Sequence, residues 1–128
     1  ACVVALGNER SGLFTPDDRL RAKLLAAAET VGEQLWHLPL GEEYSEAIQS
    51  TVADIANIGS GVGGERYGGA STAAAFLQYF TLDQKTKQPC YPWAHVDLSS
   101  SYYGAKGRPW IRGGANGFGV ETLITYFS

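Results

Sequence analysis

The chain has 128 residues, the length of one domain or of part of a larger one. Ten Lys and Arg against thirteen Asp and Glu give a net charge of −3, which argues against a nucleic-acid-binding surface or a polybasic membrane-binding surface. Charged residues make up 18% and apolar residues 45% of the chain, a globular rather than disordered composition. Apolar runs stay well short of the roughly 18 residues that a membrane-spanning helix needs.

The methionine and cysteine content bears on how this chain arises and on the redox state of the compartment in which it resides. Methionine is absent, so we expect either a removed leader or a piece of a longer chain. The two cysteines, Cys2 and Cys90, have neither the spacing of a zinc site nor the number of a disulfide framework. Two free thiols in a reducing compartment are the favoured interpretation, and one long-range disulfide is the alternative.

The first predicted element is a strand over residues 1–7, which are continuously apolar. Such a run is typical of a strand buried on both faces, as in parallel sheets. Chain ends usually lie at the surface, so a buried strand at residue 1 indicates a chain that begins in mid-domain. A loop over 7–12 follows.

A long helix is predicted next, because Thr15 can cap it and Pro16 suits the first helical position. Two acids follow at the positive end of the helix dipole. We expect the helix to end near Trp36, because Pro39 cannot continue it. Its apolar residues recur at helical spacing, at Leu20, Leu24, Ala27, Ala28, Val31 and Leu35.

The remaining elements alternate in type. We predict helices over 43–51, 70–80 and 119–127, a strand over 93–98, and loops over 81–92 and 99–114. Strand, helices, strand and helix in this order predict an α/β fold around a mixed sheet.

Candidate chemistry is sparse. The Gly-rich stretch from Gly59 to Gly69 lacks the lysine of a phosphate-binding P-loop, and conformational flexibility is the favoured interpretation. His95 and Asp97 leave the same face of the predicted strand. They suit either two metal ligands or a base with its orienting acid, but a buried His–Asp hydrogen bond is favoured. His37 has no acids clustered near it.

Serine chemistry has little support, because Ser99, Ser100 and Ser101 lack the Gly-x-Ser-x-Gly motif of a nucleophile elbow. The acid pairs 17–18 and 42–43 are typical of helix starts. The residues alone therefore predict an α/β protein without assigning its function.

Several segments, taken in order, resemble the cytosolic leucyl aminopeptidase family, whose two-metal enzymes remove N-terminal residues from peptides. The matching segments are residues 1–7 (ACVVALG), 12–14 (GLF), 32–33 (GE) with Trp36, 38–40 (LPL), 53–57 (ADIAN), 68–77 (GGASTAAAFL), 93–97 (WAHVD) and 117–120 (GFGV) before Thr122 and Leu123. They cover nearly the whole chain.

The resemblance implies that residues 1–128 form the later part of an α/β/α catalytic domain with a mixed sheet. It implies two divalent metals (zinc, manganese or magnesium) in the parent enzyme, held by a lysine and carboxylates. Those ligands, and the family's Asn-Thr-Asp-Ala-Glu-Gly-Arg motif, lie upstream of this chain. We therefore expect no catalytic or metal-binding residue here, and no activity from these residues alone. A cytoplasmic homo-hexamer of the full-length chain acting on peptides is also implied.

The resemblance assigns one functional role to this segment. The loop after residues 93–97 lines the pocket for the first side chain of the substrate, and Ser99 and Tyr102 occupy the substrate-binding positions. Simple loop packing is the alternative for both. The family usually has Ala and Gly where this chain has Ser99 and Ser100, Thr in place of Asn116 and Arg in place of Glu121.

These departures leave open a non-catalytic paralogue with a structural or assembly role, and the closing helix with the 99–114 loop are candidates for contacts in such an assembly. A free-standing binding module is disfavoured, because the apolar strands would become exposed edges.

Overall fold

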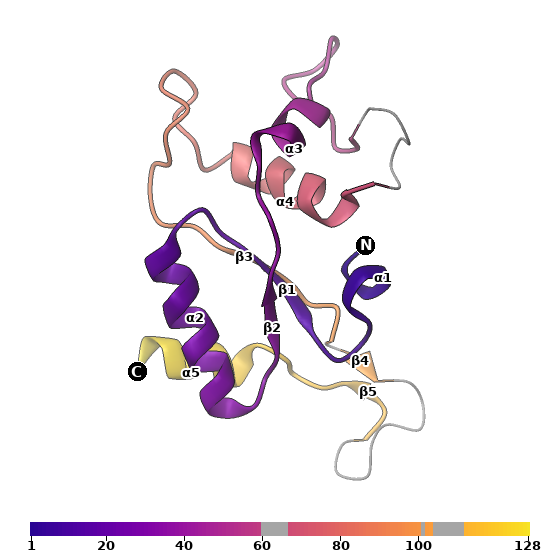
Figure 1. The fold of residues 1–128 in the computed structure, drawn as a ribbon, viewed down its shortest axis with the longest axis vertical. Helices are drawn as coiled ribbons and strands as arrows, with labels where there is room; N and C mark the ends of the chain where they lie inside the picture. The colour runs from indigo at the N-terminus through magenta and orange to yellow at the C-terminus, as the bar shows by residue number, and fades with distance from the viewer. Residues whose placement is uncertain (60–66, 101, 104–111) are drawn as a thin grey trace.

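The computed structural model describes residues 1–59, 67–100 and 112–128, together with the backbone of residues 102–103. A three-stranded mixed sheet forms its centre (Figure 1). Strand β1 (Ser11–Phe14) lies in the middle, parallel to β2 (Leu35–His37) and antiparallel to β3 (His95–Asp97). This arrangement confirms the predicted mixed α/β fold.

One face of the sheet is covered by helices α1 (Cys2–Leu6) and α4 (Gly69–Tyr79). Because strand side chains alternate between faces, Gly12 and Phe14 point to the same side. Cys2, Phe14 and Ala74 are buried together there, with Leu38, Leu40 and Ala70 packed around them.

The opposite face carries helices α2 (Asp18–Val31) and α5 (Val120–Phe127), which pack side by side (Figure 1). Leu13, which is fully buried, alternates with Gly12 and Phe14 and lies opposite Val96 on β3. Leu24 of α2 is also buried. Helices therefore lie on both faces of the sheet, in agreement with the α/β/α arrangement that the resemblance implied.

The predicted opening strand is wrong, because residues 2–6 form the short helix α1. The backbone N–H of Ala5 donates to the carbonyl of Ala1, and Gly7 donates to Val3. Only Cys2 is buried, whereas Val4 is 93% exposed. An apolar run of this length has no period that separates a strand from a helix turn, and Gly7, at a φ of 69°, ends the helix.

The long helix starts and ends differently from its prediction. Asp17, not Thr15, is the cap, and its carboxylate accepts from the Leu20 N–H at 2.9 Å. The Thr15 hydroxyl instead donates to the Trp93 carbonyl at 2.6 Å. The helix ends at Val31, because Gly32 adopts the left-handed conformation that closes a helix. The residues expected to continue the helix form β2.

The central strand β1 was not predicted and begins within the loop expected over 7–12, whereas most of the remaining elements lie close to their predicted places. Helices α4 and α5 and strand β3 fall within one or two residues of the predicted bounds. Helix α3 (Glu42–Ala47) is shorter than the helix predicted over 43–51. Two short strands that were not predicted, β4 (Tyr102–Tyr103) and β5 (Gly114–Ala115), pair antiparallel within and beside the long loop. Cys2 and Cys90 are both free thiols, as favoured.

Within the described ranges, no helix has the length and apolarity needed to cross a membrane.

Candidate substrate-pocket wall

The segment that follows β3 is fixed to the start of β1. The Ser99 hydroxyl donates to the Arg10 carbonyl at 2.6 Å, and the Ser99 N–H donates to the Asp97 carbonyl at 2.8 Å. Ser99 is half-buried. Its hydroxyl therefore has a partner in the scaffold, which places this candidate substrate-binding residue firmly at the end of β3.

Ser100, the next residue, is buried. Its side chain is 2% exposed, and its hydroxyl lies 2.7 Å from the hydroxyl of Ser11, which is fully buried. The Ser100 N–H also donates to the Ser11 hydroxyl at 3.2 Å. Asn116 completes the arrangement, because its side-chain amide donates to the Ser100 carbonyl at 2.7 Å. We call Ser11, Ser100 and Asn116 the anchor.

Tyr102, the second predicted substrate-binding residue, is described by its backbone alone. It pairs with Ala115 in the β4–β5 ladder. Its side chain lies outside the described residues, as do Ser101 and residues 60–66 of the Gly-rich stretch. The substrate-binding roles of Ser99 and Tyr102 therefore stay predictions.

His95 and Asp97 do share a face of β3, but they have different partners. The His95 ring stacks on Phe14, with 5.7 Å between ring centroids, and on Trp93 at 6.4 Å. Asp97 pairs in register with Gly12 and hydrogen-bonds the Cys2 thiol. Among the described residues, no hydrogen bond joins His95 to Asp97. The favoured interpretation, a buried hydrogen bond between these two side chains, was therefore wrong.

Burial and charge set the protonation of these groups. Desolvation, the hydrogen bond to Asp97 and the negative charge of that carboxylate raise the pKa of Cys2 to about 12. The thiol is therefore protonated at neutral pH and is a poor metal ligand. Across the parts of the chain that the structure describes, no three His, Cys, Asp or Glu side chains gather as a metal site would require.

The pKa of His95 gives a testable pH dependence. Burial lowers it below the ordinary 6.5, and the Asp97 charge opposes this shift. The unfolded imidazole takes up a proton before the folded one does, so the free energy of unfolding should fall as the pH drops below 6.5 and level off below the folded-state pKa. An NMR titration should place the His95 midpoint below 6.5, and Asp97→Asn should lower it further. A midpoint at or above 6.5 contradicts the desolvation argument.

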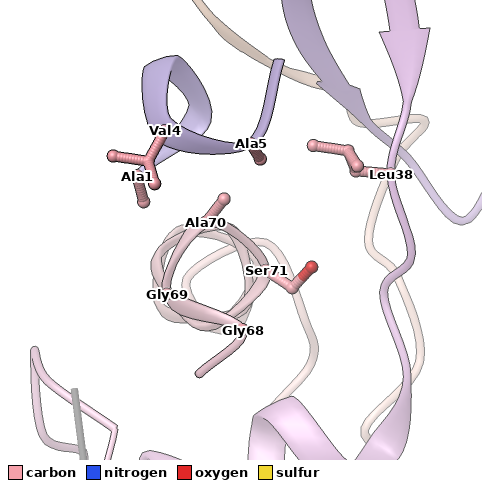
Figure 2. A pocket seen from close by; sticks show the side chains of 8 residues that line it. All are labelled: Ala1, Val4, Ala5, Leu38, Gly68, Gly69, Ala70 and Ser71. Carbon is pink, nitrogen blue, oxygen red and sulfur yellow. The ribbon is translucent and has the colours of Figure 1, made fainter. Parts of the chain in front are cut away.

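A cavity of about 570 Å³ lies between α1 and α4, beside Leu38 (Figure 2). Its lining is mostly apolar and includes one hydroxyl, that of Ser71, and no titratable side chain. Ala1, Val4, Ala5, Leu38, Gly68, Gly69, Ala70 and Ser71 line it. Such a lining offers packing space rather than acid–base chemistry.

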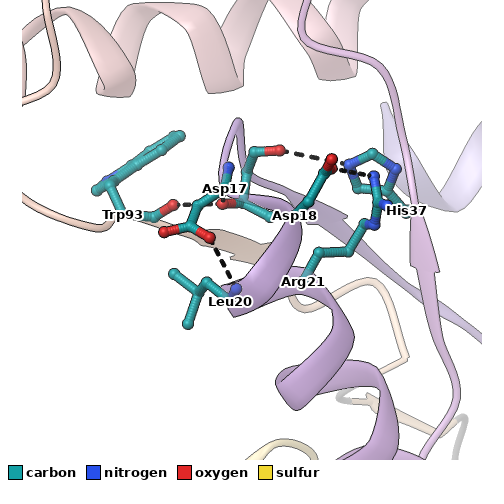
Figure 3. A network of polar contacts seen from close by, with 7 residues as sticks. Asp17, Asp18, Leu20, Arg21, His37 and Trp93 are labelled. Carbon is teal, nitrogen blue, oxygen red and sulfur yellow. Dashed lines mark hydrogen bonds and ion pairs between the residues drawn. The ribbon is translucent and has the colours of Figure 1, made fainter.

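A polar network fixes the start of α2 against the segment before β3 (Figure 3). The Thr15 hydroxyl accepts from the Asp17 N–H at 3.1 Å while it donates to Trp93. His37 lies 3.4 Å from the Thr15 carbonyl. An exposed ion pair between Asp18 and Arg21 adds at most about 1 kcal/mol. These hydrogen bonds connect β1, the start of α2 and the segment before β3. They thereby help to hold the segment that follows β3 in place.

Sequence reasoning missed the anchor. From the sequence, Asn116 is considered only as a departure from the family pattern, and Ser11 is assigned no role. Their partner Ser100 lies 89 residues from Ser11 and 16 from Asn116. No local pattern in the sequence connects positions so far apart.

Comparison with known proteins defines the class of this fold. Residues 1–124 match the model of the cytosol aminopeptidase family, catalytic domain. The chain is 45% identical over 126 residues to a probable cytosol aminopeptidase of Synechococcus sp. (strain JA-3-3Ab), covering 98% of this chain and 22% of that protein. A probable cytosol aminopeptidase of Histophilus somni (strain 129Pt) is 46% identical over 130 residues, which cover 99% of this chain and 22% of that protein.

Solved structures agree. The bottromycin maturation enzyme BotP in complex with Mn superposes with a TM-score of 0.81 at 38% identity, over 98% of this chain and 26% of that one. A mutant of tomato leucine aminopeptidase gives a TM-score of 0.75 at 38% identity, over 97% and 21% of the two chains. The chain belongs to the cytosol aminopeptidase family. It spans less than a quarter of the length of the curated relatives that it matches.

Proposed function

We propose that these residues form scaffold and one wall of the substrate pocket in a metal-dependent aminopeptidase, which releases N-terminal residues such as Leu from peptides. The observation that carries this proposal is the family match over residues 1–124. Relatives with that catalytic domain are named aminopeptidases, and two solved neighbours are a leucine aminopeptidase and a Mn-bound maturation enzyme.

The pocket wall is the segment from Ser99 to Tyr102. Its proposed role draws support from the fixed geometry at its start, where Ser99 bonds to Arg10 and Ser100 is buried against Ser11. A wall that discriminates between substrate side chains must keep its position when substrates of different size bind. Hydrogen bonds to the central strand supply such a fixed base.

Metal binding, assembly and location belong to the same proposal. We place the two divalent ions (zinc, manganese or magnesium) on residues outside these 128, since the described donors do not form a metal site. The BotP neighbour was solved with Mn. The full-length protein is proposed to assemble as a cytoplasmic homo-hexamer, and its relatives are named cytosol aminopeptidases.

The activity is tested on the full-length protein that carries these residues. With added Mn²⁺, Zn²⁺ or Mg²⁺ it should hydrolyse leucine p-nitroanilide, and EDTA should abolish the reaction. Residues 1–128 alone should be inactive, and native mass spectrometry of the full-length protein should give six subunits. Failure to hydrolyse any aminoacyl anilide with any of the three metals contradicts the proposal.

Such a failure would favour the second candidate, a non-catalytic paralogue with a structural or assembly role. The observation in its favour is that Ser99, Ser100, Asn116 and Glu121 all depart from the residues usual in the family. A hexamer without peptidase activity is the result expected of that paralogue.

Tyr102→Ala tests the pocket wall in the full-length enzyme. Removing the ring enlarges a side-chain pocket, so kcat/KM for phenylalanine p-nitroanilide should rise relative to that for alanine p-nitroanilide by about tenfold. Tyr103→Ala is the matched control, because the resemblance gives that neighbouring tyrosine no pocket role. An unchanged preference in Tyr102→Ala removes Tyr102 from the pocket.

A further inference from the structure

Ser100 and Asn116, where the resemblance leads us to expect Gly and Thr, are in direct contact. They belong to different segments, and the Asn116 amide donates to the Ser100 carbonyl at 2.7 Å. Ser99, where Ala is expected, precedes Ser100, and Glu121, where Arg is expected, lies in the first turn of α5. Asn116 and Ser100 are therefore coupled by a hydrogen bond.

Each new side chain supplies a bond that the usual residue lacks. A glycine at position 100 has no hydroxyl, so the buried Ser11 hydroxyl would lose its bond at 2.7 Å and keep only the bond from the backbone N–H of residue 100. A threonine at position 116 has a single hydroxyl and no amide. Asn116 uses both ends of its amide, since its oxygen accepts from the Phe118 N–H at 3.0 Å while its nitrogen reaches Ser100 at 2.7 Å.

The bonds connect the pocket wall to three parts of the fold. Ser11 lies on the central strand β1, Ser100 at the start of the wall, and Asn116 just after β5 and before the turn into α5. Ser11 and Ser100 are 0% and 2% exposed. A hydroxyl that loses its hydrogen-bond partner there cannot bond to water instead without a cost in free energy. The start of the wall at Ser100 is therefore held by bonds to Ser11 and Asn116. The bond from Ser99 to Arg10 adds to them.

We propose that Asn116 is a positioning residue that, with Ser11 and Ser100, holds the pocket-wall segment and thereby sets which N-terminal side chains this enzyme accepts. This inference rests on the proposed function. Asn116 acts through Ser100, whereas Ser99 and Tyr102 are the residues proposed to contact the substrate. Together, the hydrogen bonds of the anchor hold the backbone at Ser100, the buried residue at the start of the wall.

The decisive variant is Asn116→Asp in the full-length, metal-loaded enzyme. Aspartate keeps the shape and the acceptor for the Phe118 N–H but loses the donor to Ser100. Two measurements are made: kcat and KM for leucine and phenylalanine p-nitroanilides, and hydrogen exchange of the backbone amides of residues 99–103. Asn116→Thr, which introduces the usual family residue, is the second variant. Asn8→Thr, at an exposed loop position, is the matched control.

Both Asn116 variants should speed amide exchange of residues 99–103 by about five- to tenfold, the factor expected for one lost hydrogen bond. Exchange in α2 should stay unchanged, which shows that the variants fold. KM for the two substrates should rise unequally, changing the Leu to Phe preference about threefold or more, with kcat changed less than KM. The Asn8→Thr control should match the parent in both measurements.

Unchanged exchange at residues 99–103 overturns the anchor itself. Faster exchange with an unchanged Leu to Phe preference overturns its role in specificity while leaving the peptidase activity standing. A parent enzyme without peptidase activity overturns the proposed function and the specificity role with it, and this outcome is recognised before any variant is made.

Discussion

Gly12→Ala should lower the free energy of unfolding by about 2–3 kcal/mol, the upper range for overpacking a buried site. Gly12 lies in the central strand, and an added Cβ would approach the Cys2 Sγ to 2.6 Å. The same Cβ would lie 3.1 Å from the Phe14 ring and 3.2 Å from Leu38. Because all three neighbours belong to the packed face of the sheet, none moves freely. Urea unfolding followed by circular dichroism measures the loss.

Two controls isolate the steric cause. Cys2→Ala removes the closest atom, so the cost of Gly12→Ala should be smaller in the Cys2→Ala background than in the parent. Gly32→Ala has no atom within 4 Å of its new Cβ, and its left-handed conformation with a φ of 76° should cost about 1–2 kcal/mol of backbone strain without a steric contact. Equal costs for Gly12→Ala with and without the Cys2 sulfur would show that this contact is not the cause.

Glu33→Ala should cost about 2 kcal/mol, because its carboxylate accepts from two backbone N–H groups at the N-terminus of α5. One oxygen accepts from the Gly119 N–H at 2.9 Å, and the other accepts from the Thr122 N–H at 3.3 Å and from the Thr122 hydroxyl. The negative charge also faces the positive end of the helix dipole. Glu33→Gln keeps one acceptor and the shape, so its cost should be about half as large.

Glu29→Gln, one turn earlier on α2, is the matched control for the charge change. Glu29 is exposed, and its replacement should change the free energy of unfolding by less than about 0.5 kcal/mol. Thermal unfolding of the three variants, together with hydrogen exchange in α5, separates loss of the cap from general destabilisation. Exchange in α5 that is no faster in Glu33→Ala than in Glu29→Gln contradicts the capping role.

The sequence predicted those elements whose pattern is long or bounded by clear signals. The run of small and apolar residues in α4 and the apolar period of α5 located both helices closely. The apolar run over residues 1–7 led to the wrong prediction of a buried strand. Residues 2–6 instead form a short helix in which only Cys2 faces the core. Strand β2 was missed because Gly32, rather than Pro39, ends α2 and frees three residues to pair with β1.

The substrate-binding roles of Ser99 and Tyr102 stay predictions of the resemblance. The hydrogen bonds that fix Ser99 and Ser100 could not be predicted, because their partners are Arg10 and Ser11, far away in the sequence. Likewise, the strand period placed His95 and Asp97 on one face without indicating that the ring would stack and that the acid would bind a thiol. Tertiary partners decide such contacts, and a single sequence carries no local signal of them.

The hydrogen bonds that hold Ser100 and cap α5 also bear on the order in which parts of the fold form. Ser11 meets Ser100 across 89 residues, and Glu33 meets Gly119 across 86. Contacts of this separation form only after a large loop closes, so they come late, when local helices already exist. On the ribosome, β1 and α2 emerge long before either partner is made. We therefore expect residues 99–100 and the start of α5 to reach their final positions after β1 and α2 have formed.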